Sequence, residues 1–181
     1  MTKKKKSLMK ETILPMLLKI NAVSQADGVR YRDMPAEWFQ LPEGVDLKNP
    51  LTTTLLMMEE NRYLDAHDFP AAEQVIARME DPDCSMIGLY RHLINVDKIF
   101  LSILKDAEHT DISPLEDRQV KSVMRAMRNN PSVIRTEYAV AKRVRGDQDV
   151  TEKWLKRFER VKKSHPNPVE IQTEEELMAL V

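Results

Sequence analysis

The most regular hydrophobic pattern of this chain lies in residues 85–106. Polar side chains occur there at i, i+4, i+7, i+11 and i+14, which gathers them into one narrow stripe of a helix. They are Arg91, Asn95, Lys98, Ser102 and Lys105, and nearly every other position from 87 to 104 is apolar. A helix with a single polar stripe is buried on most sides. We therefore expect residues 85–106 to form the central helix of the fold.

Residues 50–80 have the pattern of a helical hairpin. Pro50 leads in the first helix, and the second begins after Asp68, whose carboxylate suits an N-cap. Pro70 then falls in the first turn, where its missing N–H costs little. We predict a tight joint at residues 67–68, of the kind that connects paired helices in repeat proteins.

Patterns of the same period predict further helices over residues 7–26, 114–129, 132–145 and 150–163, and a short acidic helix follows near the C-terminus. For the first of these helices, the expected apolar side consists of Leu8, Leu14, Leu17, Leu18 and Val23.

The helices group into three antiparallel pairs over residues 50–80, 85–129 and 132–163. This grouping predicts an all-α fold, an irregular tetratricopeptide-like stack of about eight or nine helices. We expect one globular domain with three parts. They are an N-terminal helix and connector (1–49), a helical-repeat core (50–163), and a C-terminal elbow with a short acidic helix (164–181).

The composition agrees with a helical protein, because only 4 of the 181 residues are glycine and 31% are charged. The single Cys84 allows no internal disulfide, which favours a reducing, cytoplasmic location. The cluster Lys3–Lys6 precedes an apolar run that Lys10 and Glu11 interrupt, far short of the roughly 20 apolar residues that span a bilayer. We expect a cytoplasmic protein, or the cytoplasmic face of a membrane protein.

Charge is distributed unevenly, although the net charge is -1. Residues 1–26 carry +5, residues 27–117 carry -11, residues 118–163 carry +9 and residues 164–181 carry -4. Solvated faces and mutual pairing account for such asymmetry in most proteins. Segments of opposite sign also offer a route to self-association of the chain.

The basic side chains after residue 117 have the charge to neutralise phosphates of nucleic acid or lipid head groups. They are Arg118, Lys121, Arg125, Arg128, Lys153, Lys156, Arg157, Arg160, Lys162 and Lys163. The sequence adds no recognition-helix motif, Arg-rich arm or exposed aromatic series. We expect no nucleic-acid partner.

The sequence shows no motif for catalysis, a cofactor or a metal. The four histidines are scattered without an H-E-x-x-H pair, and the four glycines do not form a phosphate-binding loop. Neighbouring acids raise the expected pKa of Cys84, and the adjacent Glu59 and Glu60 point to different faces of a helix. We expect no enzyme activity, no cofactor and no metal site.

A face for peptide docking is predicted where tyrosine and arginine occur on the first helices of the pairs, because these helices line the concave surface of helical-repeat folds. The candidate residues are Tyr63, Tyr90, Arg91, Arg135 and Tyr138. The alternative is that the tyrosines form the amphipathic edge of the core.

Six stretches of the chain share a likeness to one protein family. They are VRYRDMPAEW (29–38), YLDAHDF (63–69), NPSVIRTEYA (130–139), FERV (158–161), HPNPVEI (165–171) and EELM (175–178). Together, over about residues 20–181, they resemble the soluble tail of bacterial site-2-protease-like membrane zinc metallopeptidases, mostly of Gram-positive bacteria. In that family the H-E-x-x-H helix and a distal aspartate lie in transmembrane segments upstream, so the resemblance transfers no catalytic or metal-binding residue. It implies an excised cytoplasmic domain or a stand-alone relative.

These observations lead us to expect a non-catalytic helical-repeat module that binds a protein or peptide and resembles a regulatory protease tail. The alternative is a self-associating structural module that joins the acidic segment of one copy to the basic segment of another. A nucleic-acid-linked regulator is the least favoured hypothesis.

Overall fold

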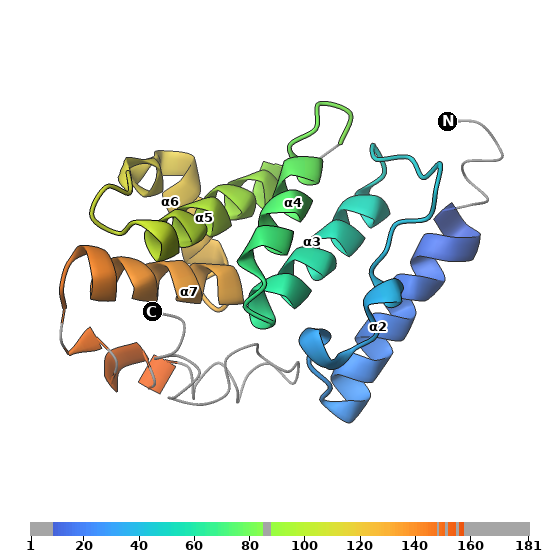
Figure 1. The fold of residues 1–181 in the computed structure, drawn as a ribbon, viewed down its shortest axis with the longest axis horizontal. Coiled ribbons are helices and arrows are strands. Elements are labelled where there is room, and N and C mark those ends of the chain that lie inside the picture. Colours follow the sequence, from blue (N-terminus) through green and yellow to red (C-terminus); the bar gives the residue numbers. More distant parts are fainter. Residues whose placement is uncertain (1–8, 85–87, 148, 151, 155, 158–181) are drawn as a thin grey trace. The chain divides into compact units, whose positions relative to one another are not determined.

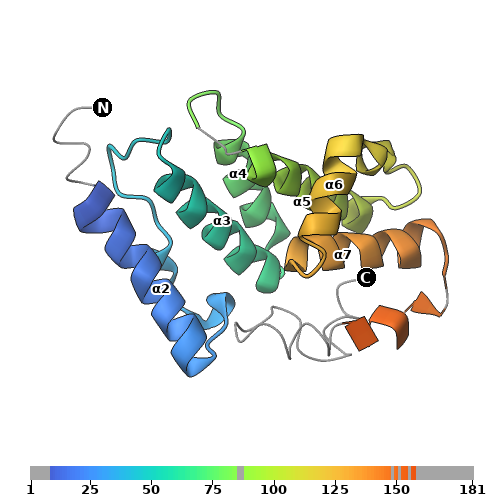
Figure 2. The same ribbon diagram turned by 180° about the vertical axis from the view of Figure 1, so that it is seen from behind.

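The computed structural model describes residues 9–84, 88–147, 149–150, 152–154 and 156–157 (Figures 1 and 2). The α-helices are α2 (Leu14–Asp27), α3 (Pro50–Asp65), α4 (Phe69–Met79), α5 (Gly88–Lys105), α6 (Arg118–Ala126) and α7 (Pro131–Ala139). Short 3-10 segments are η2 (Tyr31–Asp33), η3 (Ala36–Trp38) and η4 (Ser113–Glu116), and π-helical turns are η1 (Met9–Ile13) and η5 (Val140–Val144). Residues 150, 152–154 and 156–157 are also helical.

The prediction of an all-α fold is confirmed, since the described residues contain no strand. They contain seven helices rather than eight or nine. The expected closing helix within residues 164–181 lies outside the part of the chain that the structure describes. The tetratricopeptide-like stacking stays a prediction.

The chain divides into two compact units, unit 1 from Met1 to Ile87 and unit 2 from Gly88 to Val181. This boundary falls inside the segment 50–163 that we expected to be one repeat core. The hairpin of α3 and α4 therefore belongs to unit 1, whereas α5, α6 and α7 belong to unit 2.

Helix α3 is the central helix of unit 1, because it packs against α2, α4, η1 and η2. Half of its 16 residues are buried. They include Leu55, Leu56 and Leu64 but also five polar side chains, Thr52, Thr53, Glu59, Glu60 and Asp65. A period-based prediction places polar residues at the surface, so these five positions were not expected to be inside.

Helix α2 buries only part of its predicted apolar side. Ile13, Leu17 and Ile20, at i, i+4 and i+7, join Met34, Phe39 and Leu55 in the core of unit 1. Leu17 is buried and Val23 packs against this core, as predicted, whereas Leu14 and Leu18 are exposed. Leu8 lies outside the described residues. The π-helical turn η1 precedes α2, and Pro15 lies in the first turn of the helix.

The joint between α3 and α4 closes as a Schellman motif. The N–H of Asp68 donates to the carbonyl of Tyr63 at 2.9 Å, and the N–H of His67 donates to the carbonyl of Leu64 at 3.2 Å. His67 occupies the left-handed position with a φ of 58°. The carboxylate of Asp68 then accepts from the N–H of Ala71 and caps α4, as predicted.

Helix α5 is the central helix of unit 2 and packs against α6, α7 and η5. All five residues of its predicted polar stripe are exposed, whereas seven apolar side chains from Leu93 to Ile103 are buried. The predicted central helix is therefore confirmed within unit 2 for Gly88–Lys105, whereas residues 85–87 lie outside the described residues. The pattern did not predict that Asp97 lies on the buried side of this helix.

Side-chain caps set the starts of α6 and α7. The carboxylate of Asp117 accepts from the N–H groups of Gln119 and Val120. The side chain of Asn130 accepts from the N–H of Ser132, and Pro131 lies in the first turn. Helix α7 continues into the π-helical turn η5, which leads to the left-handed Gly146.

Candidate peptide-binding groove

Two of the five predicted docking residues are buried inside unit 2. Arg135 and Tyr138 of α7 each have an exposed fraction of 1%. Arg135 faces α5, where its Nη2 lies 3.6 Å from Oδ1 of Asp97 and its guanidinium lies 5.9 Å from the ring centroid of Phe100. Contrary to the prediction, neither residue lines an open surface, because α7 directs both side chains into the interior.

Of the other three candidates, two lie in unit 2 and one lies in unit 1. Tyr90 is half-buried and Arg91 is exposed in the first turn of α5. Tyr63 is half-buried on α3, in unit 1, with the Arg62 guanidinium 5.4 Å from its ring centroid. Tyr138 instead fits the alternative prediction, in which tyrosine is part of the core.

A groove of about 840 Å³ opens in unit 2 among η4, α6, α7, η5 and the helical residues that begin at 150. Its apolar lining consists of Leu115, Met124, Val140, Ala141, Val150 and Trp154. Met124, Val140, Val150 and Trp154 are buried, so they form its floor. Such a floor offers an apolar surface to the side chains of a bound segment.

The charged lining of the groove is mostly basic. Six basic and three acidic side chains line it. The basic ones are Lys121, Arg125, Arg128, Arg145, Lys153 and Arg157, and the acidic ones are Glu116, Glu137 and Asp147. The apolar floor is therefore surrounded by an excess of positive charge, which favours ligands of negative charge.

Two of the acidic groups are already engaged. Lys121 forms an ion pair with Glu116, and its hydrogen bond holds the pKa of that carboxyl below its usual value. Arg157 pairs with Glu137, Nη1 to Oε2, at 2.6 Å. Within the described residues, the side chains of Arg125, Arg128 and Lys153 form no ion pair. These three cations are therefore available to a ligand.

Arg157 is held in place at the rim of the groove. Its guanidinium lies 4.5 Å from the ring centroid of Trp154 and donates to the backbone carbonyl of Arg128. Together with the pair to Glu137, these contacts fix Arg157 and Trp154 relative to α6 and α7. A prearranged aromatic and cationic pair lowers the entropic cost of binding.

The sequence contained part of the signal for this groove. Five of the basic residues noted above, Lys121, Arg125, Arg128, Lys153 and Arg157, line it. Arg118 and Lys156 are exposed elsewhere, and Arg160, Lys162 and Lys163 lie outside the described residues. The apolar floor was not foreseen as part of a site, because its residues have the pattern of ordinary core positions.

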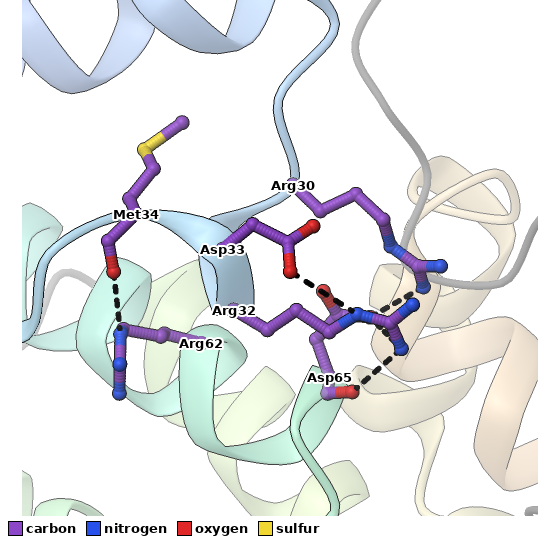
Figure 3. A network of polar contacts seen from close by, with 6 residues as sticks. All are labelled: Arg30, Arg32, Asp33, Met34, Arg62 and Asp65. Carbon is purple, nitrogen blue, oxygen red and sulfur yellow. Dashed lines mark hydrogen bonds and ion pairs between the residues drawn. The ribbon is translucent and has the colours of Figure 1, made fainter.

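A second polar cluster lies in unit 1, at the C-terminal end of α3 (Figure 3). Arg30 Nη2 lies 2.5 Å from Oδ1 of the buried Asp65, and Arg32 donates to the backbone carbonyl of the same residue at 3.4 Å. Arg62 donates from Nε to the carbonyl of Met34 at 3.4 Å. These contacts hold the connector around η2 against α3.

This cluster joins two of the stretches on which the family resemblance depends, residues 29–38 and 63–69. Its groups are paired arginines and a carboxylate in ion pairs, an arrangement that fastens a loop to a helix. These two stretches therefore contain residues that build unit 1.

Two further buried carboxylates each lie close to the guanidinium of an arginine. Glu59 lies 3.0 Å from Nη1 of Arg78, and burial, partly opposed by Arg78, raises its pKa. Both Glu59 and Glu60 are buried, although we expected different faces. In unit 2, burial raises the pKa of Asp97 to about 6, opposed by Arg135 and by a hydrogen bond to Ser132. Neither carboxylate lines the groove.

Among the described residues, no three His, Cys, Asp or Glu side chains gather into a possible metal site. No helix in that part of the chain has the length and apolar character needed to cross a membrane. Comparison of the chain with protein-family models, with curated proteins and with solved structures finds no match.

Proposed function

We propose that this chain is a non-catalytic binding module whose groove in unit 2 takes an acidic, partly apolar peptide segment of a partner protein. The observation that carries the proposal is the combination of a buried apolar floor with an excess of basic side chains. Apolar contact supplies affinity, and the cations select the charge of the ligand. An amphipathic helix with one acidic and one apolar face presents both features to a groove.

Trp154 provides a direct test, because it lines the groove and the chain has only one other tryptophan, Trp38. In a Trp38→Phe background, the fluorescence of Trp154 is followed during titration with a synthetic helix of about 14 residues whose faces are glutamate and leucine. We expect saturable binding that weakens as salt rises. A peptide with lysine in place of glutamate serves as the control and should bind far more weakly.

Charge reversal tests the role of the basic side chains that line the groove. Arg125→Glu with Lys153→Glu should weaken binding of the acidic peptide about tenfold or more, because attraction becomes repulsion. Arg118→Glu is the matched control, since Arg118 is an exposed cation of α6 outside the groove. Equal binding of the acidic and basic peptides, or equal effects of the two sets of reversals, would overturn the proposal.

We further propose that the module acts as the regulatory, cytoplasm-facing tail of a membrane metallopeptidase, a role that the resemblance of residues 29–38, 63–69 and 130–139 supports. The reading frame immediately ahead of the codon for Met1 provides the test. Membrane-spanning segments with an H-E-x-x-H helix in that frame support the assignment. A frame that encodes no such segments would contradict the assignment and leave the chain as a solitary module.

A further inference from the structure

We propose that the acidic C-terminal segment of the chain, residues 169–181, binds in the basic groove of its own unit 2 and competes there with a partner peptide. This inference depends on the proposed function, because it requires the same groove to take an acidic, partly apolar segment. It adds the regulation of that groove.

The first argument is the unbalanced charge of the groove. Arg125, Arg128 and Lys153 surround a floor that includes Trp154, and they pair with no acid among the described residues. Cations grouped on a rim repel one another, and an acidic segment in the groove relieves that repulsion.

The second argument is the composition of the segment. Residues 169–181, VEIQTEEELMALV, contain four glutamates and no basic residue. Glu174, Glu175 and Glu176 are followed directly by Leu177, Met178 and Leu180, so charge and apolar surface are adjacent, as the groove requires. Residues 27–117 are also strongly acidic, but most of their acidic side chains belong to folded helices and the connections between them.

The third argument is distance along the chain. Arg157 lines the groove, and 11 residues separate it from Val169. Even when residues 158–163 continue the helix that the sequence predicts and only residues 164–168 are extended, the connection spans up to roughly 30 Å, which is enough to return to a groove at its own starting point. A short tether gives the segment an effective concentration on the order of millimolar, so weak contacts suffice to occupy the groove.

Paramagnetic labelling tests the location. Because Cys84 is the only cysteine, Thr173→Cys in a Cys84→Ser background places one spin label in the segment of the full-length protein. We expect broadening of the amide signals of Met124, Val140 and Ala141, and recovery of those signals at high salt. Reversal of Glu174, Glu175 and Glu176 to lysine should also restore them. Unaffected groove amides would overturn the inference.

A mixed sample separates the segment of the same chain from that of a second copy. Isotope-labelled protein without the spin label is combined with unlabelled protein that carries it. If the mixture shows the same broadening as protein that carries both the isotope and the spin label, the segment binds between copies and the proposal is overturned. We expect the mixture to show little broadening.

Competition distinguishes this inference from the proposed function. The reversal of the three glutamates should raise the affinity for the synthetic acidic peptide about tenfold, because the groove is no longer occupied. Exchange of Glu108, an exposed acid outside the groove, for lysine is the matched control. If the wild-type chain binds the acidic peptide and the reversal leaves that affinity unchanged, the inference fails and the proposed function stands. If neither form binds the peptide, both fail.

Discussion

Asp65 is the residue on which the packing of the connector against α3 depends most directly. Its Oδ1 lies 2.5 Å from Arg30 and 3.9 Å from Arg32, and its side chain is almost completely buried. A buried ion pair gains little over a well-packed apolar pair, but removal of one partner leaves a charge without its counter-charge in the interior.

We therefore expect Asp65→Asn to lower the free energy of unfolding by about 3–5 kcal/mol, because the nearly buried Arg30 guanidinium loses the carboxylate that lies 2.5 Å from it. Urea denaturation followed by circular dichroism measures the loss. Asp33→Asn is the control, since Asp33 is exposed and its contact with Arg32 is 3.9 Å long. A loss of the same size in both variants would contradict a special role for the buried pair.

Asp97 gives unit 2 a dependence on pH. Burial raises its pKa in the folded state to about 6, whereas an aspartate in an unfolded chain titrates near about 4. The folded state therefore holds this proton more tightly, and the stabilisation that it contributes below about pH 4 is lost as the pH rises through about 6.

We expect the stability of the wild-type protein to fall, relative to Asp97→Asn, between about pH 4 and pH 6. The free energy of unfolding from urea titrations across this range measures the difference. Glu152→Gln, at an exposed carboxyl whose pKa Lys156 lowers, is the control and should not reproduce that slope. A constant difference between wild type and Asp97→Asn would refute the assignment.

At the scale of elements, the joint between α3 and α4 imposes a backbone conformation that few side chains favour. His67 has a φ of 58° at the left-handed position of the Schellman motif. Its ring is stacked on Phe69 with 5.8 Å between centroids. A β-branched residue is strained in this region, whereas asparagine adopts it more readily.

We expect His67→Val to destabilise the protein by about 1–2 kcal/mol, and His67→Asn to have a much smaller effect. Thermal unfolding of the two variants beside the wild type checks this, and both lose the stacking on Phe69 equally. If the asparagine variant is destabilised as strongly as the valine variant, the loss of stacking rather than the backbone is the cause.

The ends of elements were predictable because short-range chemistry determines them. Pro50 and Asp68 mark helix boundaries by a fixed φ and a side-chain cap. The buried face of α2 was not predictable in the same way. Two apolar stripes, one through Leu14 and Leu18 and one through Ile13, Leu17 and Ile20, compete at helical spacing, and only tertiary packing decides between them.

Two of the five predicted docking residues, Arg135 and Tyr138, are buried for a related reason. Arg135 has the pattern of a surface position, but Asp97 meets it from another helix at 3.6 Å. Two residues 38 positions apart carry no local sign of their pairing. The basic residues of the groove were recognisable as a group, whereas their arrangement around Met124, Val140 and Trp154 required the fold of unit 2.

At the scale of the whole molecule, the fold of unit 2 brings basic residues from distant parts of the sequence together. Basic residues from α6 and from the helical residues after 150 meet in one groove, although about 30 residues separate Lys121 from Lys153 in sequence. This convergence favours a ligand site over a uniformly solvated face. It also sharpens the alternative of self-association, because a second copy would have to place an acidic segment in that groove.

Sedimentation velocity over a range of salt concentrations separates the two hypotheses. With the C-terminal segment in its own groove, the wild-type chain should remain monomeric at low salt. Exchange of Glu174, Glu175 and Glu176 for glutamine removes that competitor, and the exposed cations should then attract an acidic segment of a second copy, in a complex that dissociates as salt rises. A wild-type dimer that dissociates at high salt would instead favour the self-associating module. In that case reversal of Arg125 and Lys153 to glutamate should abolish the dimer, whereas Arg118→Glu should not, because only the first two cations line the groove.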